Sequence, residues 1–403
     1  MNFSSVSWFR QAAPSAFAVG SGRLRGWTLS PLMIGLAVYM SCYWPADTSF
    51  LSYSLAGAFA IHLWSRPQAS EVALIPIAAL LFLVLYLVRQ GVPALYVATP
   101  GFFLGLGSLA VLGIRGIRER ESPPVAFPAL LLPTALVVTV LARPLWTPAN
   151  PAWDWAMLAF DSRLGGQSSF VLGRTFAREP WIAAIHQELY NALPLGMAFL
   201  YAAHMGAAKS IERQRVIILL LTTPLLCALI YRLVPVVGPK FAFPDLYPWR
   251  VPTLPRMPYP LISLNPEILR NGLPSMHFGW ALLIWWGLYR RSAIWAWVSG
   301  AFVVLTVIAT LGLGQHYLID LIVAVPFVGM LQAAIAEERS WWGARVVLFG
   351  GGLLATMAWI WVLRQPDAWG SGTVLVLLSA LSVAVPLWLV RKLDRPLEPR
   401  TVQ

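Results

Sequence analysis

Charged residues are scarce in this sequence: Asp, Glu, Lys and Arg make up 11% of its 403 residues, whereas hydrophobic residues make up 58%. A chain with so little charge has more apolar surface than one aqueous core can hide. The composition therefore excludes an ordinary water-soluble protein. It predicts an all-α, polytopic membrane protein, because a backbone in lipid must satisfy its hydrogen bonds internally.

Cysteine and clustered carboxylates are also nearly missing. The two cysteines, Cys42 and Cys227, lie far apart inside apolar segments, which excludes a disulfide framework and gives no pattern for a zinc site. We interpret both as packing residues and expect neither a metal nor a cofactor. Residues 1–26 lack a continuous apolar stretch, so they do not resemble a cleaved signal peptide, and we expect the first apolar segment to stay as an anchor.

Long apolar stretches are what the chain has in abundance. A helix needs about 20 apolar residues to cross a bilayer, and we find about twelve candidate transmembrane helices. They lie near residues 27–44, 50–64, 72–88, 96–114, 123–142, 183–204, 216–234, 274–290, 293–313, 316–336, 345–363 and 371–390.

The distribution of polar residues divides these segments into three parts. Residues 1–120 form an N-terminal transmembrane module of about four helices with almost no internal charge. Residues 121–340 form a six-helix core with two long connections, and residues 341–403 add two helices and a tail. One of the long connections, 235–270, contains nine prolines, which cannot continue a helix, so we expect an extended lid there.

The positions of the basic residues explain the net charge of +12. Lys and Arg gather at alternate ends of the apolar segments, as in cytoplasmic loops of membrane proteins, and this pattern excludes nucleic acid as the partner. With twelve spans, both termini are cytoplasmic. Connections 143–182 and 235–273, together with His277 and His316, then lie on the outer, periplasmic face of a multi-pass protein of the inner membrane.

His316 and Asp320 form the first candidate catalytic pair. In a helix that enters the membrane, positions i and i+4 share a face, so Asp320 is expected to accept a hydrogen bond from one imidazole nitrogen and leave the other as a nucleophile. A carboxylate inside a span is rare unless it is paired or functional. The alternative is a contact that only stabilises the helix.

His277 ends the segment Asn271-Gly-Leu-Pro-Ser-Met-His277 on the same side of the membrane. Pro274 suits the first turn of a helix, and free amides there, with the Ser275 hydroxyl, favour an anion such as phosphate. His277 can then protonate a leaving oxygen. The alternative is a helix start whose histidine lies at the lipid headgroups.

A third polar segment begins with Tyr231 and Arg232 and reaches Lys240 after the Gly238-Pro239 turn. Arginine binds phosphate through two parallel hydrogen bonds and lysine as a point charge. Both residues are therefore candidates to bind a phosphate placed between the histidines. Snorkelling to lipid headgroups is the alternative.

Together these segments resemble the type 2 phosphatidic acid phosphatase superfamily of membrane lipid phosphatases and phosphotransferases. Its second motif, Pro-Ser-Gly-His, is similar to Pro274–His277 with Met for Gly, and His316 and Asp320 match the end of its third motif. The resemblance covers residues 123–337 and implies a lipid phosphatase-like six-helix core. It implies that His316 is the nucleophile, Asp320 its stabiliser and His277 the general acid and base.

The departures from the family pattern narrow the resemblance. Ala309 and Thr310 stand where the third motif has Ser-Arg, so the arginine that binds phosphate is missing. This gap and the element ending at Lys240 resemble the branch of inositol phosphorylceramide synthase, sphingomyelin synthase and their bacterial relatives. The segments 160–165 and 188–191 are similar to that branch too. It implies transfer of a phosphorylated head group between lipids.

Three functions follow as hypotheses. The favoured one is a metal-independent lipid phosphotransferase or phosphatase acting on a lipid phosphate or phosphodiester through a phosphohistidine. A non-enzymatic lipid-binding or transport protein of the same fold is the alternative, because the Ser-Arg pair is missing. A polyprenyl-dependent glycosyltransferase would usually need an acidic pair in the first outer loop, where only Asp47 occurs.

Polar residues outside these motif segments are predicted to have structural or accessory functions. Asp154, Asp161 and Arg163 are predicted to lie on an interfacial helix, and His186 and Glu188 to line the head-group pocket or cap a helix. His62 and His204 are interpreted as structural. The lid arginines Arg250, Arg256 and Arg270 are candidates to attract anionic head groups.

Overall fold

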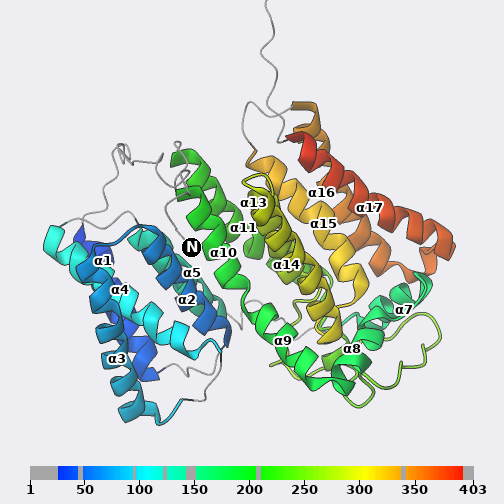
Figure 1. The fold of residues 1–403 in the computed structure, drawn as a ribbon. Coiled ribbons are helices and arrows are strands. Elements are labelled where there is room, and N and C mark those ends of the chain that lie inside the picture. Colours follow the sequence, from blue (N-terminus) through cyan, green and yellow to red (C-terminus); the bar gives the residue numbers. More distant parts are fainter. Residues whose placement is uncertain are drawn as a thin grey trace, which may run out of the picture. The chain divides into compact units, whose positions relative to one another are not determined.

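A computed structural model describes residues 26–43, 49–93, 97–120, 125–141, 151–205, 210–336 and 342–393. Within these ranges the regular elements are helices (Figure 1), and one isolated bridge joins Ala152 to Ile262. The prediction of an all-α protein is therefore confirmed for the described residues. The chain divides into two compact units, residues 1–136 with 194–217, and residues 137–193 with 218–403.

The first unit is built around helix α4. It contains α1 (Gly26–Tyr43), α2 (Ser49–Trp64), α3 (Ala69–Gln90), α4 (Thr99–Glu119), the first part of α5 (Ala126–Leu141), nearly all of α10 (Leu193–Met205) and the first residues of α11 (Ser210–Leu233). Glycines on α4 allow three helices to approach closely. A Cβ at Gly105 would lie 2.3 Å from the Leu55 carbonyl oxygen of α2, and one at Gly107 would lie 2.5 Å from the Ile75 oxygen of α3. Small residues at such crossings are typical of membrane helix packing.

One ion pair lies within this packing. Arg115 of α4 approaches Glu71 of α3 at 3.3 Å, and Arg115 also reaches Glu119 one turn along its own helix. His62 of α2 is fully buried near this pair, as expected for a structural histidine.

The second unit contains the rest of α11 and ten further elements. They are α7 (Asp154–Arg163), α8 (Ser168–Arg178), α9 (Pro180–Asn191), α12 (Pro239–Ala242), α13 (Met276–Leu288), α14 (Ala293–Gly312), α15 (Leu318–Ala334), α16 (Trp342–Arg364), η3 (Pro366–Ala368) and α17 (Gly372–Leu393).

Helix α15 is the centre of this unit. Nearly every residue of α15 is buried, because α13, α16, α17 and α7 pack around it. Gly352 lets α16 approach the backbone of α15: a Cβ there would lie 2.6 Å from the Pro326 carbonyl oxygen. Figure 1 shows α7, α8 and α9 gathered around one end of α14 and α15. The first turn of α15 therefore lies among several elements that are distant in sequence.

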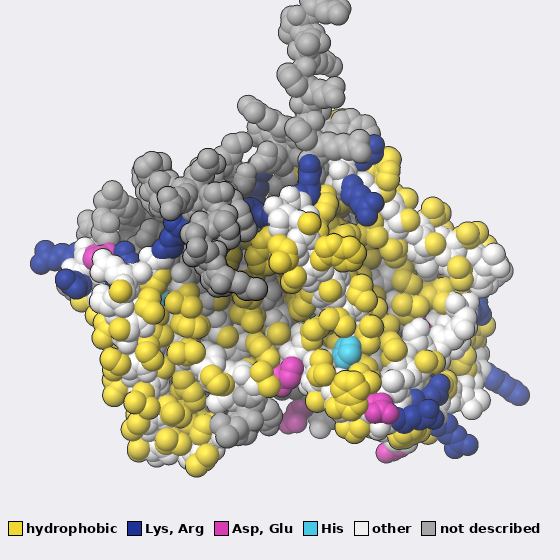
Figure 2. All heavy atoms as spheres, viewed as in Figure 1, with side chains coloured by type: hydrophobic (Ala, Val, Ile, Leu, Met, Phe, Trp, Pro, Cys, Tyr) yellow, Lys and Arg dark blue, Asp and Glu magenta, His cyan; other side chains and the backbone are white. Residues whose placement is uncertain are grey.

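The number of spans differs from the sequence prediction. Six described helices are long and apolar enough to cross a membrane, namely α3, α4, α11, α14, α16 and α17, and six more apolar helices have 10–17 described residues. Twelve spans stay a prediction. The predicted segment 183–204 is two helices, α9 and α10, because Pro194 removes a donor and favours a new first turn. Figure 2 shows hydrophobic side chains over the middle of the visible face and Lys and Arg toward its ends.

Candidate active site

Three loops of the second unit meet at the first turn of α15. They are residues 236–240 after α11, residues 272–275 before α13 and residues 314–317 before α15. The Gly272 amide donates to the Val236 oxygen at 2.8 Å, and the Lys240 amide donates to the Gly314 oxygen at 3.1 Å. The Ser275 amide donates to the Asp320 backbone oxygen at 3.0 Å. The structure therefore brings together the three motif segments that the sequence singled out.

Two glycines make this meeting possible. Gly238 has a φ of +95°, and a Cβ there would lie 2.2 Å from the Gln315 carbonyl oxygen. Gly314 has a φ of +69°, and its Cβ would contact the Tyr247 ring at 2.6 Å and the Lys240 Cβ at 2.9 Å. A side chain at either position would collide with the facing loop, and the positive φ also favours glycine. The loop of Lys240 therefore lies directly against the loop of His316.

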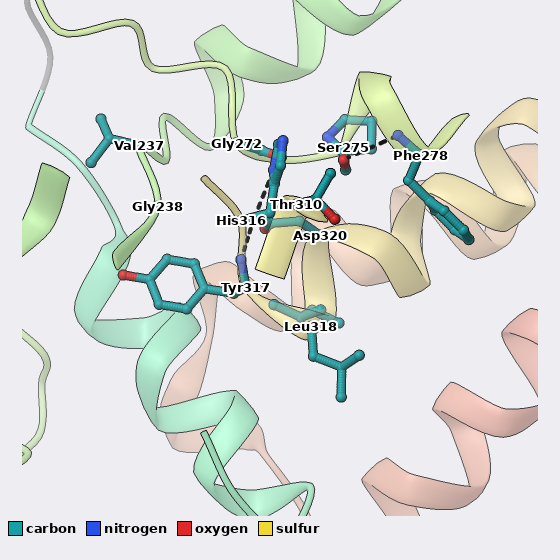
Figure 3. A network of polar contacts seen from close by, with 12 residues as sticks. Val237, Gly238, Gly272, Ser275, Phe278, Thr310, His316, Tyr317, Leu318 and Asp320 are labelled. Atoms are coloured by element: carbon teal, nitrogen blue, oxygen red, sulfur yellow. Dashed lines mark hydrogen bonds and ion pairs between the residues drawn. The ribbon is translucent and has the colours of Figure 1, made fainter. Parts of the chain in front are cut away.

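The protonation of His316 follows from its partners. Its Nδ1 lies 3.0 Å from the Gly272 carbonyl oxygen and 3.4 Å from the Asp320 Oδ2 atom, and Figure 3 shows the ring pointing toward Gly272. A carbonyl oxygen only accepts hydrogen bonds, so Nδ1 must carry the proton. In the neutral ring the lone pair then lies on Nε2. This is the tautomer that a nucleophile at Nε2 requires.

The contact between His316 and Asp320 has a different origin from the one expected. We predicted a helix starting at 316 in which the two residues share a face, but α15 begins at Leu318 and His316 precedes it. Asp320 accepts a hydrogen bond from the Tyr317 amide at 2.8 Å, and a carboxylate in this first-turn position caps a helix. The cap fixes the start of α15 at Leu318, after His316, and the Asp320 side chain therefore turns back toward the imidazole.

His277 lies in the first turn of α13 and is stacked on Tyr190 of α9. The ring centroids are 3.7 Å apart and the planes differ by 15°. The hydrogen bond from the Ser275 amide to the Asp320 backbone oxygen joins the two segments that carry His277 and His316. The stacking also adds Tyr190 to this site, from the segment 188–191 that resembles the family branch, although its contact across 87 positions has no signal in the sequence.

The five candidate substrate-binding residues lie in different surroundings. Ser275 is the N-cap of α13, and its Oγ accepts from the Phe278 amide at 3.5 Å. The Tyr231 hydroxyl is buried and donates to the Pro274 oxygen at 3.3 Å. Lys240 is exposed, with its Nζ 5.9 Å from the centroid of its neighbouring Phe241 ring. Asn271 and Arg232 are exposed as well.

The positions of the missing Ser-Arg pair are filled without charge. Ala309 and Thr310 are fully buried in α14, and the Thr310 hydroxyl donates to the Thr306 and Val307 oxygens of its own helix. A cation that binds phosphate here would have to come from another segment, and Lys240 is on the loop that touches Gly314.

Arg270 differs from the expectation that lid arginines attract head groups. Its side chain is 1% exposed. Its guanidinium donates to the carbonyl oxygens of Leu264 at 2.9 Å, of Asn265 at 2.9 Å and of Ile268. Arginine has five donors in a fixed fork, so this residue binds the turn that precedes the site instead of a ligand at the surface.

The polar residues of α7 approach the site more closely than the sequence indicated. Asp154 accepts from the Val237 and Gly238 amides, and Asp161 accepts from the Leu318 and Ile319 amides. Both carboxyls are fully buried. Burial raises the pKa of Asp154 to about 7 and that of Asp161 to about 8, although the donated amide protons oppose the rise. Neither residue belongs to the three motif segments.

Comparison with known families identifies the region that contains this site. Residues 155–334 match the model of the PAP2 superfamily. This PAP2 region runs from α7 to the end of α15, so it contains all three loops, both histidines and Asp320. This is the superfamily that the motifs resemble. A match to it suggests a phosphatase or phosphotransferase that acts on lipid-type substrates. No curated protein and no solved structure matches the chain.

The PAP2 region covers less than half of the chain. Helices α1–α5 precede it and α16 and α17 follow it. Within the described residues, no group of three or more His, Cys, Asp or Glu side chains is arranged to hold a metal ion.

Proposed function

We propose that this protein is a membrane lipid phosphatase or head-group phosphotransferase that acts through a phosphohistidine on His316. The observation that supports this most directly is the Nδ1–H of His316, directed at the Gly272 oxygen with Asp320 behind it. This arrangement leaves Nε2 as a nucleophile within a region that matches the PAP2 superfamily.

The first step is a displacement at phosphorus. Nε2 of His316 attacks the phosphorus of a lipid phosphate or phosphodiester, an N–P bond forms and the P–O bond to the leaving alcohol breaks. His277 donates a proton to the leaving oxygen, which departs as the alcohol. The His316 ring becomes positively charged, and Asp320 and the Gly272 oxygen stabilise that charge through Nδ1–H.

The second step restores the enzyme. Water or the hydroxyl of an acceptor lipid gives its proton to His277 and attacks the phosphorus, and the N–P bond breaks. If water is the acceptor, the protein is a phosphatase. If a lipid alcohol is the acceptor, it is a phosphotransferase, like the branch that this chain resembles in lacking the Ser-Arg pair. Each proton transfer contributes about 10²–10⁴-fold in rate. We place the site at the outer face of the inner membrane, as the arrangement of basic residues predicts.

The alternative function is a lipid-binding or transport protein that keeps the fold without turnover. The buried, uncharged Ala309 and Thr310 favour it, because they remove a cation from the expected phosphate site. Removing one donor to the transferring group typically lowers kcat by about 10²–10³-fold. Lys240 is our candidate to replace that donor.

The test uses purified protein in lipid nanodiscs. We expect release of phosphate from phosphatidic acid, or transfer of a labelled head group to an added lipid alcohol, and inhibition of either reaction by vanadate. His316→Ala should lower the rate by at least about 10³-fold and abolish a labelled protein adduct that is stable in base and labile in acid. His204→Ala, in the first unit with its Nδ1 on the Leu200 oxygen, is the matched control.

Two outcomes would count against an enzyme. Wild-type rates in folded His316→Ala would exclude His316 as the nucleophile. Binding of phosphatidic acid with no turnover, with or without acceptor, would favour the lipid-binding alternative.

A further inference from the structure

Helix α7 contacts one of the three site loops and the start of α15 with its two carboxylates. Asp154 and Asp161 are seven residues apart, which is two turns, so they lie on one face about 10 Å apart along the axis. Each carboxylate accepts two backbone amides from a segment that is distant in sequence. One ten-residue helix therefore connects the Lys240 loop with the start of α15.

The contacts of Asp154 fix the turn of the Lys240 loop. Its Oδ1 accepts from the Gly238 amide at 2.9 Å and its Oδ2 from the Val237 amide at 3.2 Å. Gly238 is also the residue whose positive φ brings this loop against Gln315. A displacement of Asp154 would therefore move the backbone that holds Lys240.

The contacts of Asp161 fix the start of α15. Its Oδ2 accepts from the Leu318 amide at 2.8 Å and its Oδ1 from the Ile319 amide at 3.1 Å. These are the first two amides of the helix, which have no partner within it, and a carboxylate there is favoured by the helix dipole. Figure 3 shows Leu318 directly after His316 and Tyr317, on the segment that Asp161 holds.

Helix α7 is itself held on another side by residues beyond the PAP2 region. The ring of Phe160 packs edge-on against Trp359 of α16 and Trp369, with centroids 5.5 and 5.3 Å away. The Arg163 guanidinium lies 5.2 Å from the Trp369 ring centroid and donates to the Trp369 and Gly370 oxygens at 3.4 Å. The segment joining α16 to α17 thus supports the helix that holds the site loops.

We propose that Asp154 and Asp161 are positioning residues of the catalytic site. Asp154 sets the Lys240 loop, which binds the phosphate, and Asp161 sets the loop of the nucleophile His316. The expected changes in kcat and KM rest on the proposed function, whereas the expected changes in amide exchange do not. A displacement of about 1 Å at reacting groups can lower a rate by 10²-fold, which is the magnitude at issue.

The two carboxylates have separable consequences because they hold different loops. Loss of the Asp161 contacts should mainly lower kcat, since the nucleophile moves relative to the phosphorus while phosphate binding persists. Loss of the Asp154 contacts should lower kcat and also raise KM, since Lys240 moves away from a phosphate that it contacts both before and during the transfer. Two carboxylates that merely stabilise the fold would instead lower the amount of folded protein and leave both constants of the folded fraction unchanged.

The experiment compares Asp154→Asn and Asp161→Asn in the full-length protein in nanodiscs. Amide hydrogen exchange is measured on peptides covering residues 236–240 and 316–320, with phosphatidic acid turnover in parallel. We expect roughly 10- to 100-fold faster exchange at 318–319 in Asp161→Asn and at 237–238 in Asp154→Asn, because each variant replaces one of the two acceptor oxygens with an NH2 group that cannot accept from a backbone amide. Asp367→Asn, an exposed carboxylate of η3, is the matched control.

The exchange measurement separates this proposal from the proposed function, because it needs no turnover. A wild type without lipid turnover would overturn the enzyme while the loop-specific exchange still supports the positioning roles. Equal exchange in both loops for both variants, or kinetics equal to those of Asp367→Asn, would overturn the positioning roles. If Asp161→Asn does not fold, Asp161→Ser keeps a neutral acceptor oxygen for the same comparison.

Discussion

Gly238→Ala is the sharpest perturbation of the contact between the site loops. The φ of +95° and ψ of 156° at Gly238 lie in a region that is essentially restricted to glycine, where another residue costs about 1–3 kcal/mol. The added Cβ would also lie 2.2 Å from the Gln315 carbonyl oxygen and 2.6 Å from its carbon. Both neighbours are backbone atoms, so the two loops must separate by about 1 Å to restore an ordinary contact distance.

A separation of that size moves Lys240 away from His316. We expect kcat/KM for phosphatidic acid to fall by about 10²-fold, measured as phosphate release per molecule of folded, monodisperse protein. The thermal midpoint should fall by roughly 2–12 °C, because a loss of 1–3 kcal/mol lowers the midpoint of a domain of this size by about 2–4 °C per kcal/mol.

The control for Gly238→Ala is Gly165→Ala. Gly165 also has a positive φ, +110°, but a Cβ there meets nothing within 4 Å. It therefore reproduces the backbone strain without the collision. If both variants lose activity to the same extent, strain alone explains the loss and our account of the loop contact is wrong.

Two further predictions concern other residues of the site. Tyr190→Phe keeps a ring stacked on His277 and should retain kcat within about threefold. Tyr190→Leu removes the ring and should lower kcat by about tenfold, because aromatic pairs contribute about 0.5–1.5 kcal/mol. Equal rates of the two variants in steady-state assays would contradict a role for the ring. Burial raises the pKa of Asp161 to about 8 from 3.8, so its contribution to stability is present below about pH 4 and is lost as the pH rises through 8. The thermal midpoint of the wild type relative to Asp161→Asn should therefore fall between pH 5 and 8, and a pH-independent difference would contradict the buried carboxyl.

The sequence alone allowed the fold class and the approximate helix positions to be predicted. Apolar stretches near residues 72–88, 293–313 and 371–390 correspond to α3, α14 and α17, because hydrophobicity over a bilayer's width is a local property. Helix ends were less accessible. The break between α9 and α10 and the start of α15 depend on a proline and a capping carboxylate, whose effects the apolar pattern does not contain.

The candidate site was accessible in part for the same reason. His277, His316 and Asp320 stand in short motifs with fixed order, so their types and spacing alone selected them, and the match of residues 155–334 agrees with the superfamily that they resemble. Tyr190 and Gly272 contribute through contacts across 87 and 44 positions, as a ring face and a backbone carbonyl. Neither kind of contact leaves a signature in the residues around it.

Scarce charge and long apolar runs thus determined by themselves that this chain is helical and suited to a membrane, and the histidine motifs predicted which residues carry its chemistry. Only the tertiary structure decided how His316 is protonated, because the Gly272 carbonyl that fixes Nδ1–H comes from a loop before another helix. It also decided that Asp154 and Asp161 belong beside the site and that Arg270 does not. The physical reason is that hydrophobic periodicity acts along the chain, whereas a buried polar group must find its partner wherever the fold brings one.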